Sequence, residues 1–422
     1  MIRRLALLAV LAGCGAPPGS ECAPARLAPL SRTPSYAVVT SDYGATAIAL
    51  LDAEGALLEE AWIDSGTTEA GLAATLNGDV VLPGTPLRDG TLTLLDRFAT
   101  DVLTRVPLAP PIVPVQAEVR ASAASRGWSP NPHDVAAHDA GRLVLTRFER
   151  NPAPDAPLLD RGDDVVLLDL ASRAVVSRVD LAALGAVVEG EPVAARPDGL
   201  ARAGAFYAAG LARLSADFMR AGPGAVAVVD VDAGTAQAVA LDGFVYCGEV
   251  RALDVPLAEP LAVAGEVDVV ALCQGATFVD EAERRAGAGL AVVRVDATGD
   301  ARVVRTWRAS AHTEVGSPTN LVAVLDAGRV VYAARGEASS ANTDRLVVVA
   351  LAGGEARTAY VSPLRFALLG GAYDAARGLL LVPEAALGVR RFDVGADLTL
   401  TPRDAVDVSP CRGLPARQVG AL

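Results

Sequence analysis

Side chains suited to chemistry are few in this chain and do not cluster along the sequence. The three histidines are His133, His138 and His312, so a histidine-rich metal site is not expected. His133 stands next to Asp134 and two residues after Asn131, a group that could ligate an ion or hydrogen-bond a ligand. The alternative is that His133 only caps a turn, with His138 and His312 solvated in turns of their own.

Catalytic patterns with fixed spacing are missing from the sequence. No Gly-x-Ser-x-Gly segment, glycine-rich phosphate loop or Walker pattern occurs, and the acidic stretches lack the spacing of a calcium loop. A Ser-His-Asp triad stays open, since its members are brought together by the fold rather than by the sequence. The sequence alone therefore assigns no catalytic residue.

The elements that must position these side chains are short β-strands in a repeat. Two or three β-branched or leucine residues, often followed by Asp and a tight turn, predict hairpins that begin at 48–52, 92–96, 165–169, 226–230, 292–296, 346–351 and 389–393. A second hairpin precedes most of them, most clearly at 72–82, 135–145, 321–333 and 368–382. The unit therefore has four strands and about 55 residues, somewhat more than a typical propeller repeat.

Seven such units predict an all-β fold, a seven-bladed β-propeller of four-stranded antiparallel blades over residues 35–422. The alternatives are a β-helix, which needs a shorter and stricter period, and two sandwiches, which need a central linker. Blade one lacks a first strand before residues 36–40. We expect residues 414–422 to supply it, so that the ring closes by C-terminal strand exchange.

Polar residues of both signs occur near the predicted start of each blade. If the repeats align, they surround the axial mouth and form a polar pocket for a small anionic or carbohydrate-like ligand. The alternative is that they form salt links between blades. The candidate axial residues are Glu69, Asn131, His133, Asp134, Arg196, Asp198, Glu249, Arg251, Asn320, Arg365 and Arg412.

The N-terminal segment carries an export signal. Arg3 and Arg4 precede an apolar run at 5–11, which is too short to span a bilayer. The run ends in Leu-Ala-Gly-Cys at Cys14, which resembles the lipobox of bacterial lipoproteins. The resemblance implies a signal peptide at 1–13, a diacylglyceryl group on Cys14, and a flexible tether at 14–34.

The resemblance also bears on location. Position 15 is Gly rather than the Asp of the inner-membrane retention pattern, which favours anchoring in the outer membrane of the cell envelope. The alternative is an ordinary signal peptide with a chance cysteine. Both interpretations make this an exported protein.

The other four cysteines fit two disulfides in an exported protein, with three possible pairings. We expect Cys247–Cys273, which would join neighbouring strands, and Cys22–Cys411, which would join the two ends of the folded region. The formal net charge is −13 and every basic residue is Arg, without long basic clusters. An acidic balance of this kind argues against a nucleic-acid partner.

The long connections are expected on one face of the disc. They are predicted at 107–130, 149–162, 215–224, 276–288 and 336–343, whereas the turns between strands one and two and between strands three and four are tight. Antiparallel strands place these two sets on opposite faces. Insertions in repeat proteins mark the binding side, so we expect partners on the long-loop side.

Several segments resemble the repeats of YVTN-type bacterial propellers, a lactonase-like and quinoprotein-like class. These segments are 131–136, 162–169, 196–201 and 222–230. The pattern departs from the better repeats in blades one and five, where the first strand is hard to see. Members of the class include binding proteins and lactonase-like enzymes, so the resemblance implies a fold and not an activity.

Two functions follow as hypotheses. The first is a non-catalytic binding or interaction scaffold of the cell envelope, without a cofactor, that takes a protein, glycan or small ligand on the long-loop face. The second is a metal-dependent, lactonase-like hydrolase with Ca²⁺ or another divalent cation at the axis. The second would use the carboxylates and histidine at Glu69, His133, Asp134, Asp198 and Glu249.

Overall fold

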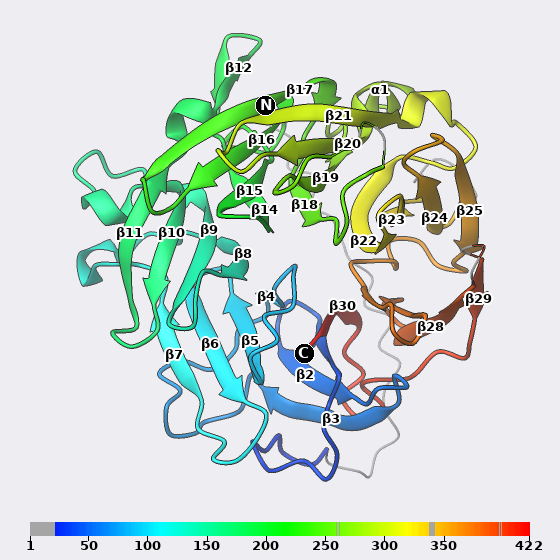
Figure 1. Cartoon of the computed structure of the whole chain (residues 1–422). Coiled ribbons are helices and arrows are strands. Elements are labelled where there is room, and N and C mark those ends of the chain that lie inside the picture. Colours follow the sequence, from blue (N-terminus) through cyan, green and yellow to red (C-terminus); the bar gives the residue numbers. More distant parts are fainter. Residues whose placement is uncertain (1–21, 259, 261, 337–341, 396, 398) are drawn as a thin grey trace, which may run out of the picture.

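The computed structural model describes residues 22–422, apart from 259, 261, 337–341, 396 and 398. Seven four-stranded antiparallel sheets surround an axis and form the predicted seven-bladed β-propeller (Figure 1). The expected signal peptide at 1–13 and lipidation of Cys14 lie outside the described residues. Within the part that is described, no helix is long and apolar enough to cross a membrane.

The first four blades run from the axis to the rim in strand order. Blade one has β30 (Ala416–Ala421), β1 (Tyr36–Ser41), β2 (Thr46–Leu51) and β3 (Leu57–Asp64). Blade two has β4 (Val80–Val81), β5 (Thr91–Asp96), β6 (Val102–Pro107) and β7 (Val115–Glu118). Blade three has β8 (Pro132–Ala137), β9 (Arg142–Arg150), β10 (Gly162–Asp169) and β11 (Ala174–Asp180). Blade four has β14 (Pro197–Ala203), β15 (Phe206–Leu211), β16 (Pro223–Asp230) and β17 (Thr235–Val245).

The remaining three blades follow the same order. Blade five has β18 (Glu249–Ala252), β19 (Val267–Gln274), β20 (Ala288–Val295) and β21 (Ala301–Arg308). Blade six has β22 (Pro318–Asp326), β23 (Arg329–Ala334), β24 (Arg345–Ala350) and β25 (Ala356–Val361). Blade seven has β26 (Ala372–Asp374), β27 (Leu379–Pro383), β28 (Val389–Val394) and β29 (Leu400–Pro402). Outside the blades lie the hairpin β12 (Ala186–Val188) and β13 (Glu191–Val193), the helix α1 (Glu281–Gly287), and short 3₁₀ turns.

Burial explains why these sequences form blades. The middle strands β1 and β2 are buried along their whole length, which suits their runs of β-branched and leucine residues. Most of the outer strand β17 is exposed or half-buried, as expected at the rim of a blade. Seven of the eight hydrophobic clusters of the described residues join facing sheets of neighbouring blades, as where one cluster contains Leu290 of blade five and Tyr332 of blade six.

The ring closes as predicted. The C-terminal strand β30 pairs antiparallel with β1, from Tyr36 opposite Ala421 to Thr40 opposite Ala416. The side-chain amide of Gln418 accepts from the Leu82 N–H at 2.7 Å and donates to the Leu82 carbonyl at 3.1 Å. This side chain therefore bonds the backbone of blade two as a strand would, and links the first and second blades at the closure.

Blade two was predicted one strand out of register. The hairpin at 92–96 was expected to begin with the third strand, but β5 is the second. The first strand, β4, has only two residues, and β7 lies within 107–130, which was expected to be a loop. Proline-rich sequence before residue 115 hides this short strand.

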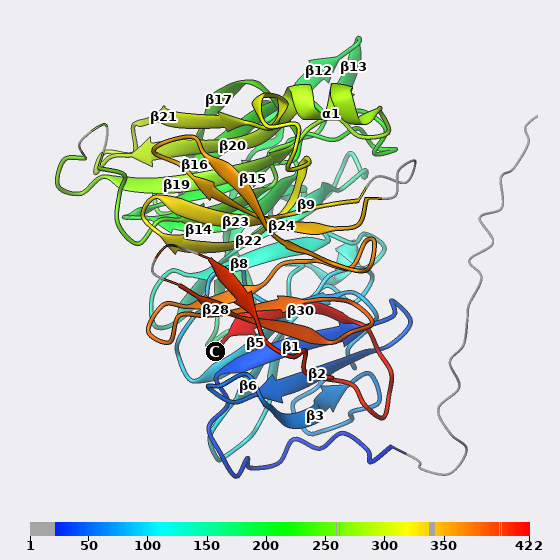
Figure 2. The same ribbon diagram turned by 90° about the vertical axis from the view of Figure 1, so that its right-hand side faces the viewer.

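The two faces of the disc carry different connections. The long-loop face holds the connections from second to third strands and from each blade to the next, and the tight-turn face holds the others. The predicted long loops between β9 and β10, β15 and β16, β19 and β20, and β23 and β24 are confirmed on the long-loop face. The β12–β13 hairpin and α1 project on one side of the disc (Figure 2).

One long insertion is on the unexpected side. The connection from β18 to β19 belongs to the tight-turn face, and its described residues are 253–258, 260 and 262–266. The buried Arg294 donates to Asp268 and to the carbonyls of Leu257 and Pro260. This guanidinium ties the insertion to the ring. The brevity of β18 concealed the insertion in the sequence.

Both expected disulfides are present, Cys22–Cys411 and Cys247–Cys273. The described part of the expected tether, 22–34, lies against blade one. There the Trp62 indole donates to the carbonyl of Ala28, and Leu27 packs on the core.

Candidate functional site

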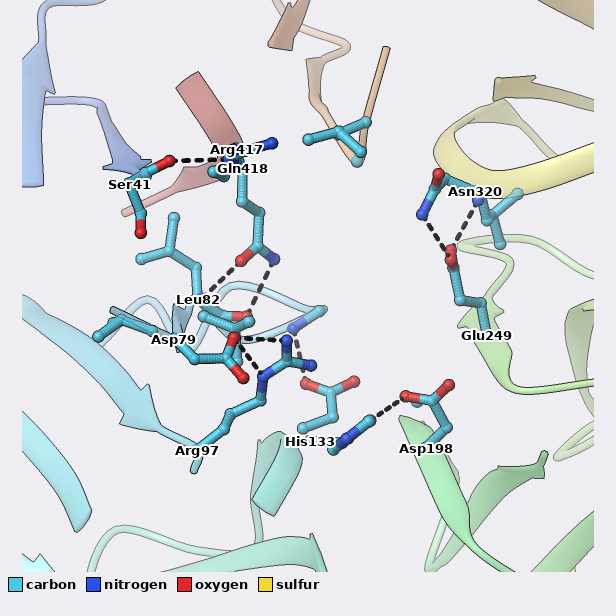
Figure 3. Close-up of a pocket in the computed structure, with 18 of the residues that line it drawn as sticks. Ser41, Asp79, Leu82, Arg97, His133, Asp198, Glu249, Asn320, Arg417 and Gln418 are labelled. Atoms are coloured by element: carbon cyan, nitrogen blue, oxygen red, sulfur yellow. Dashed lines mark hydrogen bonds and ion pairs between the residues drawn. The ribbon is translucent and has the colours of Figure 1, made fainter. Parts of the chain in front are cut away.

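The seven innermost strands surround an axial cavity of about 240 Å³. Residues from all seven blades line it, and the polar ones come mainly from the start of each first strand (Figure 3). A second hollow of about 160 Å³ continues the axis towards the tight-turn face and shares Gly84, Arg251, Gly370 and Gln418 with the first. Arg251 thus lies where the two hollows meet.

Six of the eleven candidate residues line this cavity: His133, Asp134, Asp198, Glu249, Arg251 and Asn320. The other five lie in connections that precede a first strand, where the chain is still crossing from rim to axis. Asn131 and Arg196 directly precede β8 and β14, Glu69 and Arg365 are exposed, and Arg412 pairs with Asp64. The repeat therefore indicated the correct end of each blade. The number of residues between a candidate residue and the start of the first strand varied between blades.

His133 and Asp198 form one pair across blades three and four. The imidazole Nδ1 lies 2.7 Å from Asp198 Oδ1, and the ring stacks on Phe148 with centroids 4.1 Å apart. Burial would raise the pKa of Asp198, but the adjacent imidazole reverses that effect and holds the pKa below its ordinary value. Within the described residues, His133 Nε2 has no hydrogen-bond partner, so this nitrogen is available to a ligand.

Asp134 is buried and holds three parts of the ring together. Its carboxylate accepts from the backbone N–H groups of Gly84, Val135 and Leu200. Burial raises its pKa, against the opposing effects of Arg251 and these donors. A Cβ on Gly84 would meet the Asp134 carboxylate at 2.5 Å and Arg251 at 2.6 Å, so only glycine permits this approach.

Glu249 makes the corresponding link between blades five and six. It accepts from the Leu321 N–H at 2.6 Å and from the Asn320 amide at 3.1 Å. Burial raises the pKa of Glu249 to about 7, although Arg251 and the Leu321 N–H oppose the rise. This carboxyl group therefore changes charge near neutral pH.

Arg251 is the cation among these carboxylates. Its charge acts on Asp134, Asp198 and Glu249, yet the guanidinium makes one hydrogen bond to the described protein, to the carbonyl of Val250 at 3.0 Å. A guanidinium carries five N–H donors. Arg251 is half-buried in the cavity, so most of its donors remain available to a small anion.

Sequence analysis missed the part of the cavity that blades one and two supply. Arg97 bonds Asp79 through two nitrogens, and Arg417 donates to the Ser41 carbonyl while lying over the Tyr43 ring. These residues come from connections and from the exchanged strand, not from a recognisable repeat opening. The hairpin expected at 72–82 is wrong, since the structure has only the two-residue strand β4 (Val80–Val81) there.

The described residues do not fit the metal site of the hydrolase hypothesis. No three His, Cys, Asp or Glu side chains among them come together as a set of metal ligands. Asp134 and Glu249 are occupied by backbone donors, Asp198 by His133, and Glu69 is distant from the axial cavity. No reaction step is therefore assigned to a metal at this site.

Comparison with known proteins adds the fold alone. No protein-family model and no curated protein matches the chain. A structure provisionally named as a 6-phosphogluconolactonase from Bacteroides fragilis NCTC 9343 is 10% identical with a TM-score of 0.53, covering 92% of this chain and 98% of that one. Another from Bacteroides uniformis ATCC 8492 is 10% identical with a TM-score of 0.55, covering 93% and 100%. The chain thus has a lactonase-like propeller fold.

Proposed function

We propose that this chain is an exported, non-catalytic binding protein whose axial cavity takes a small polar ligand with a carboxylate or phosphate group. The observation that carries the proposal is the Arg251 guanidinium, which faces the cavity with most of its donors unused by the described protein. The carboxylates around it are engaged in joining blades, which leaves them to shape the site rather than to react.

The experiment is isothermal titration of the protein with gluconate, 6-phosphogluconate and inorganic phosphate. Arg251→Gln should weaken the tightest interaction about tenfold, because a charge-assisted hydrogen bond is lost. Arg202→Gln is the matched control, since Arg202 bonds the carbonyls of Ala137 and Gly204 outside the cavity. An equal loss in both variants, or no binding of any probe, would reject the proposal.

A second candidate is hydrolysis of a lactone, favoured by the His133–Asp198 pair. A carboxylate bonded to Nδ1 orients the imidazole and lets Nε2 take a proton from water, as in general-base catalysis. The similar structures bear the lactonase name, which is why the reaction deserves testing. Turnover of 6-phosphogluconolactone above the spontaneous rate, abolished in His133→Asn, would replace the binding proposal with this one.

The proposed location is the cell envelope. The two disulfides fit an extracellular or periplasmic compartment. Lipid attachment at Cys14, and with it the outer membrane, is part of the proposal. Mass spectrometry of the mature N-terminus should find a diacylglyceryl group on Cys14, and an unmodified Cys14 would refute the anchor.

A further inference from the structure

Exposed aromatic residues of the described chain all lie on the long-loop face. Tyr43, Phe98, Phe218, Phe278 and Phe366 are the five, and Phe278 is 72% exposed. Elsewhere on the described surface, Val113, Val255 and Val263 are exposed in connections of the tight-turn face, and Val176, Val303 and Val361 are exposed on outer strands. The exposed rings of the described chain are therefore confined to one face.

Four of these five rings belong to a set of residues that recurs from blade to blade around the disc. In six blades the connection between second and third strands carries an exposed large apolar residue, and in blade four it carries two, Phe218 and Met219. We call six of them the apolar crown: Tyr43, Phe98, Leu158, Phe218, Phe278 and Leu387. Because they share one face of the disc, these residues can contact a single broad surface together.

Three of the six crown residues have an unusual backbone conformation. Tyr43, Phe218 and Phe278 have φ values of 67°, 62° and 56°, in the left-handed region that bulky residues rarely adopt. Arg417 lies 4.7 Å from the Tyr43 ring centroid, and Arg196 lies 4.2 Å from that of Phe218. Strained backbone conformations persist where the surrounding structure fixes them, so the positions of these three rings are set by the fold.

The point at which the described chain enters the propeller indicates which partner the crown contacts. The described chain begins at Cys22, which is bonded to Cys411 in the connection from β29 to β30, and this connection belongs to the long-loop face. The Arg412 guanidinium bonds the Ala23 carbonyl and Asp64, which ends β3. Figure 2 shows the described chain entering on the side from which β12, β13 and α1 project. From Cys14 to Cys22, a fully extended chain spans at most about 29 Å.

We infer that the apolar crown rests on the phospholipid surface that carries Cys14, with the disc flat on the bilayer and its axial mouth turned towards it. The inference rests on the proposed lipid anchor. A short tether raises the effective concentration of the crown at the surface, and aromatic rings favour the headgroup level. The formal net charge of −13 offers no general attraction to anionic lipids, so apolar contact carries the docking.

Fluorescence of lipid-bound protein tests the inference. The native cysteines are all in disulfides or at Cys14, so Phe98→Cys and Phe278→Cys each add one labelling site, and Val255→Cys on the tight-turn face is the matched control. The full mature protein, with lipidation verified by mass, is placed in vesicles of phosphatidylethanolamine and phosphatidylglycerol. An NBD label should shift to the blue and be quenched by headgroup nitroxide lipid at 98 and 278 but not at 255.

The outcomes separate the two proposals. Equal quenching at the three positions in lipidated protein would overturn the docked crown and leave the anchor intact. Absence of the lipid would overturn both. Cross-linking of 98 and 278 to an envelope protein, without quenching in pure lipid, would assign the crown to a protein partner instead. In the docked state, Phe98→Ser with Phe278→Ser should return a label at Leu158→Cys to a solvent-like spectrum, whereas Val255→Ser with Val263→Ser should not.

Discussion

The turn aspartates of the tight-turn face and the carboxylates that join blades in the long-loop half behave in opposite ways. On the tight-turn face, Asp139 closes the turn from β8 to β9, accepting from the Gly141 N–H and bonding Arg142, which together hold its pKa at about 2. Asp169 and Asp296 close their turns likewise and have lowered pKa values. On the long-loop half, burial raises the pKa of Glu249 to about 7 and that of Asp163 to about 6.

The two groups of carboxylates differ in how far apart in the sequence the residues that they join are. A turn aspartate bonds residues two to four positions away and stays in water. Asp163 accepts from the N–H groups of Ala195 and Arg196, and Glu249 from that of Leu321, so each fixes the entry of another blade. The long-loop half therefore pays a desolvation cost for joining blades, and this half contains the axial site.

Opening the ring should lower the stability of the protein more than any other change, and it should destabilise both faces alike. Deleting residues 412–422 removes β30, leaves β1 with an unpaired edge and breaks the Gln418–Leu82 link. We expect no cooperative thermal unfolding by circular dichroism. Replacing 187–192 with a short glycine loop, which trims only the β12–β13 hairpin, should leave the transition in place. A truncated protein that melts like the full chain would contradict the closure.

One buried arginine stabilises each face. Arg147 bonds Asp164 through two nitrogens beneath the loop at 151–161, and Arg294 does the same with Asp268 on the tight-turn face. Arg294→Met leaves the buried Asp268 without its arginine partner and should cost about 3–5 kcal/mol in urea unfolding. Arg147→Met should cost less, because Arg178 also bonds Asp164 at 2.7 Å. Arg294→Met with Asp268→Leu should recover part of the loss. A cost near zero for both single variants would show that the pairs are dispensable.

Ligand affinity should depend on pH through the long-loop half. As pH falls through about 7, Glu249 takes up a proton and neutralises Arg251 less, so an anion should bind several-fold more tightly at pH 6 than at pH 8. Glu249→Gln should remove this dependence. Titration calorimetry at the two pH values measures it, and an unchanged slope in the variant would assign the dependence elsewhere.

The free energy of unfolding should also depend on pH, and the raised pKa of Glu249 and the lowered pKa of Asp139 should act in opposite directions. Between pH 4.5 and about 7 the folded protein keeps a proton on Glu249 that the unfolded chain has released, so the free energy of unfolding falls as pH rises through this window. The stability of Glu249→Gln relative to the parent should therefore rise by about 2–3 kcal/mol from pH 5 to pH 8. A gain at pH 5 instead would contradict the raised pKa.

Substitution of a turn aspartate should have the smallest effect on stability. Asp139 has a folded pKa of about 2, below its ordinary 3.8, so its contribution is present above pH 3.8 and is lost as pH falls through about 2. Asp139→Ala should lower the thermal midpoint slightly at pH 7 and have no effect in strong acid. A loss of stability that persists in acid would mean that the aspartate acts by packing and not by charge.

The same contrast explains what the sequence could predict. Asp-turn pairs such as Asp139 with Gly141 are local, so the hairpins and the blade number followed from the chain. The strand exchange followed from the missing first strand of blade one, and both disulfides followed from the number and positions of the cysteines. The axial site is non-local. His133, Asp198, Glu249 and Arg251 were found because each lies in a first strand, whereas the contributions of Arg97 and Arg417 depend on contacts that no spacing encodes.

A crystal structure of the protein with the tightest-binding anion from the titrations tests the central claim most directly. The anionic group should lie in the axial cavity, within hydrogen-bond distance of the Arg251 guanidinium, and His133 Nε2 should lie beside the ligand. An anion bound elsewhere, with Arg251 still bonded only to Val250, would contradict it.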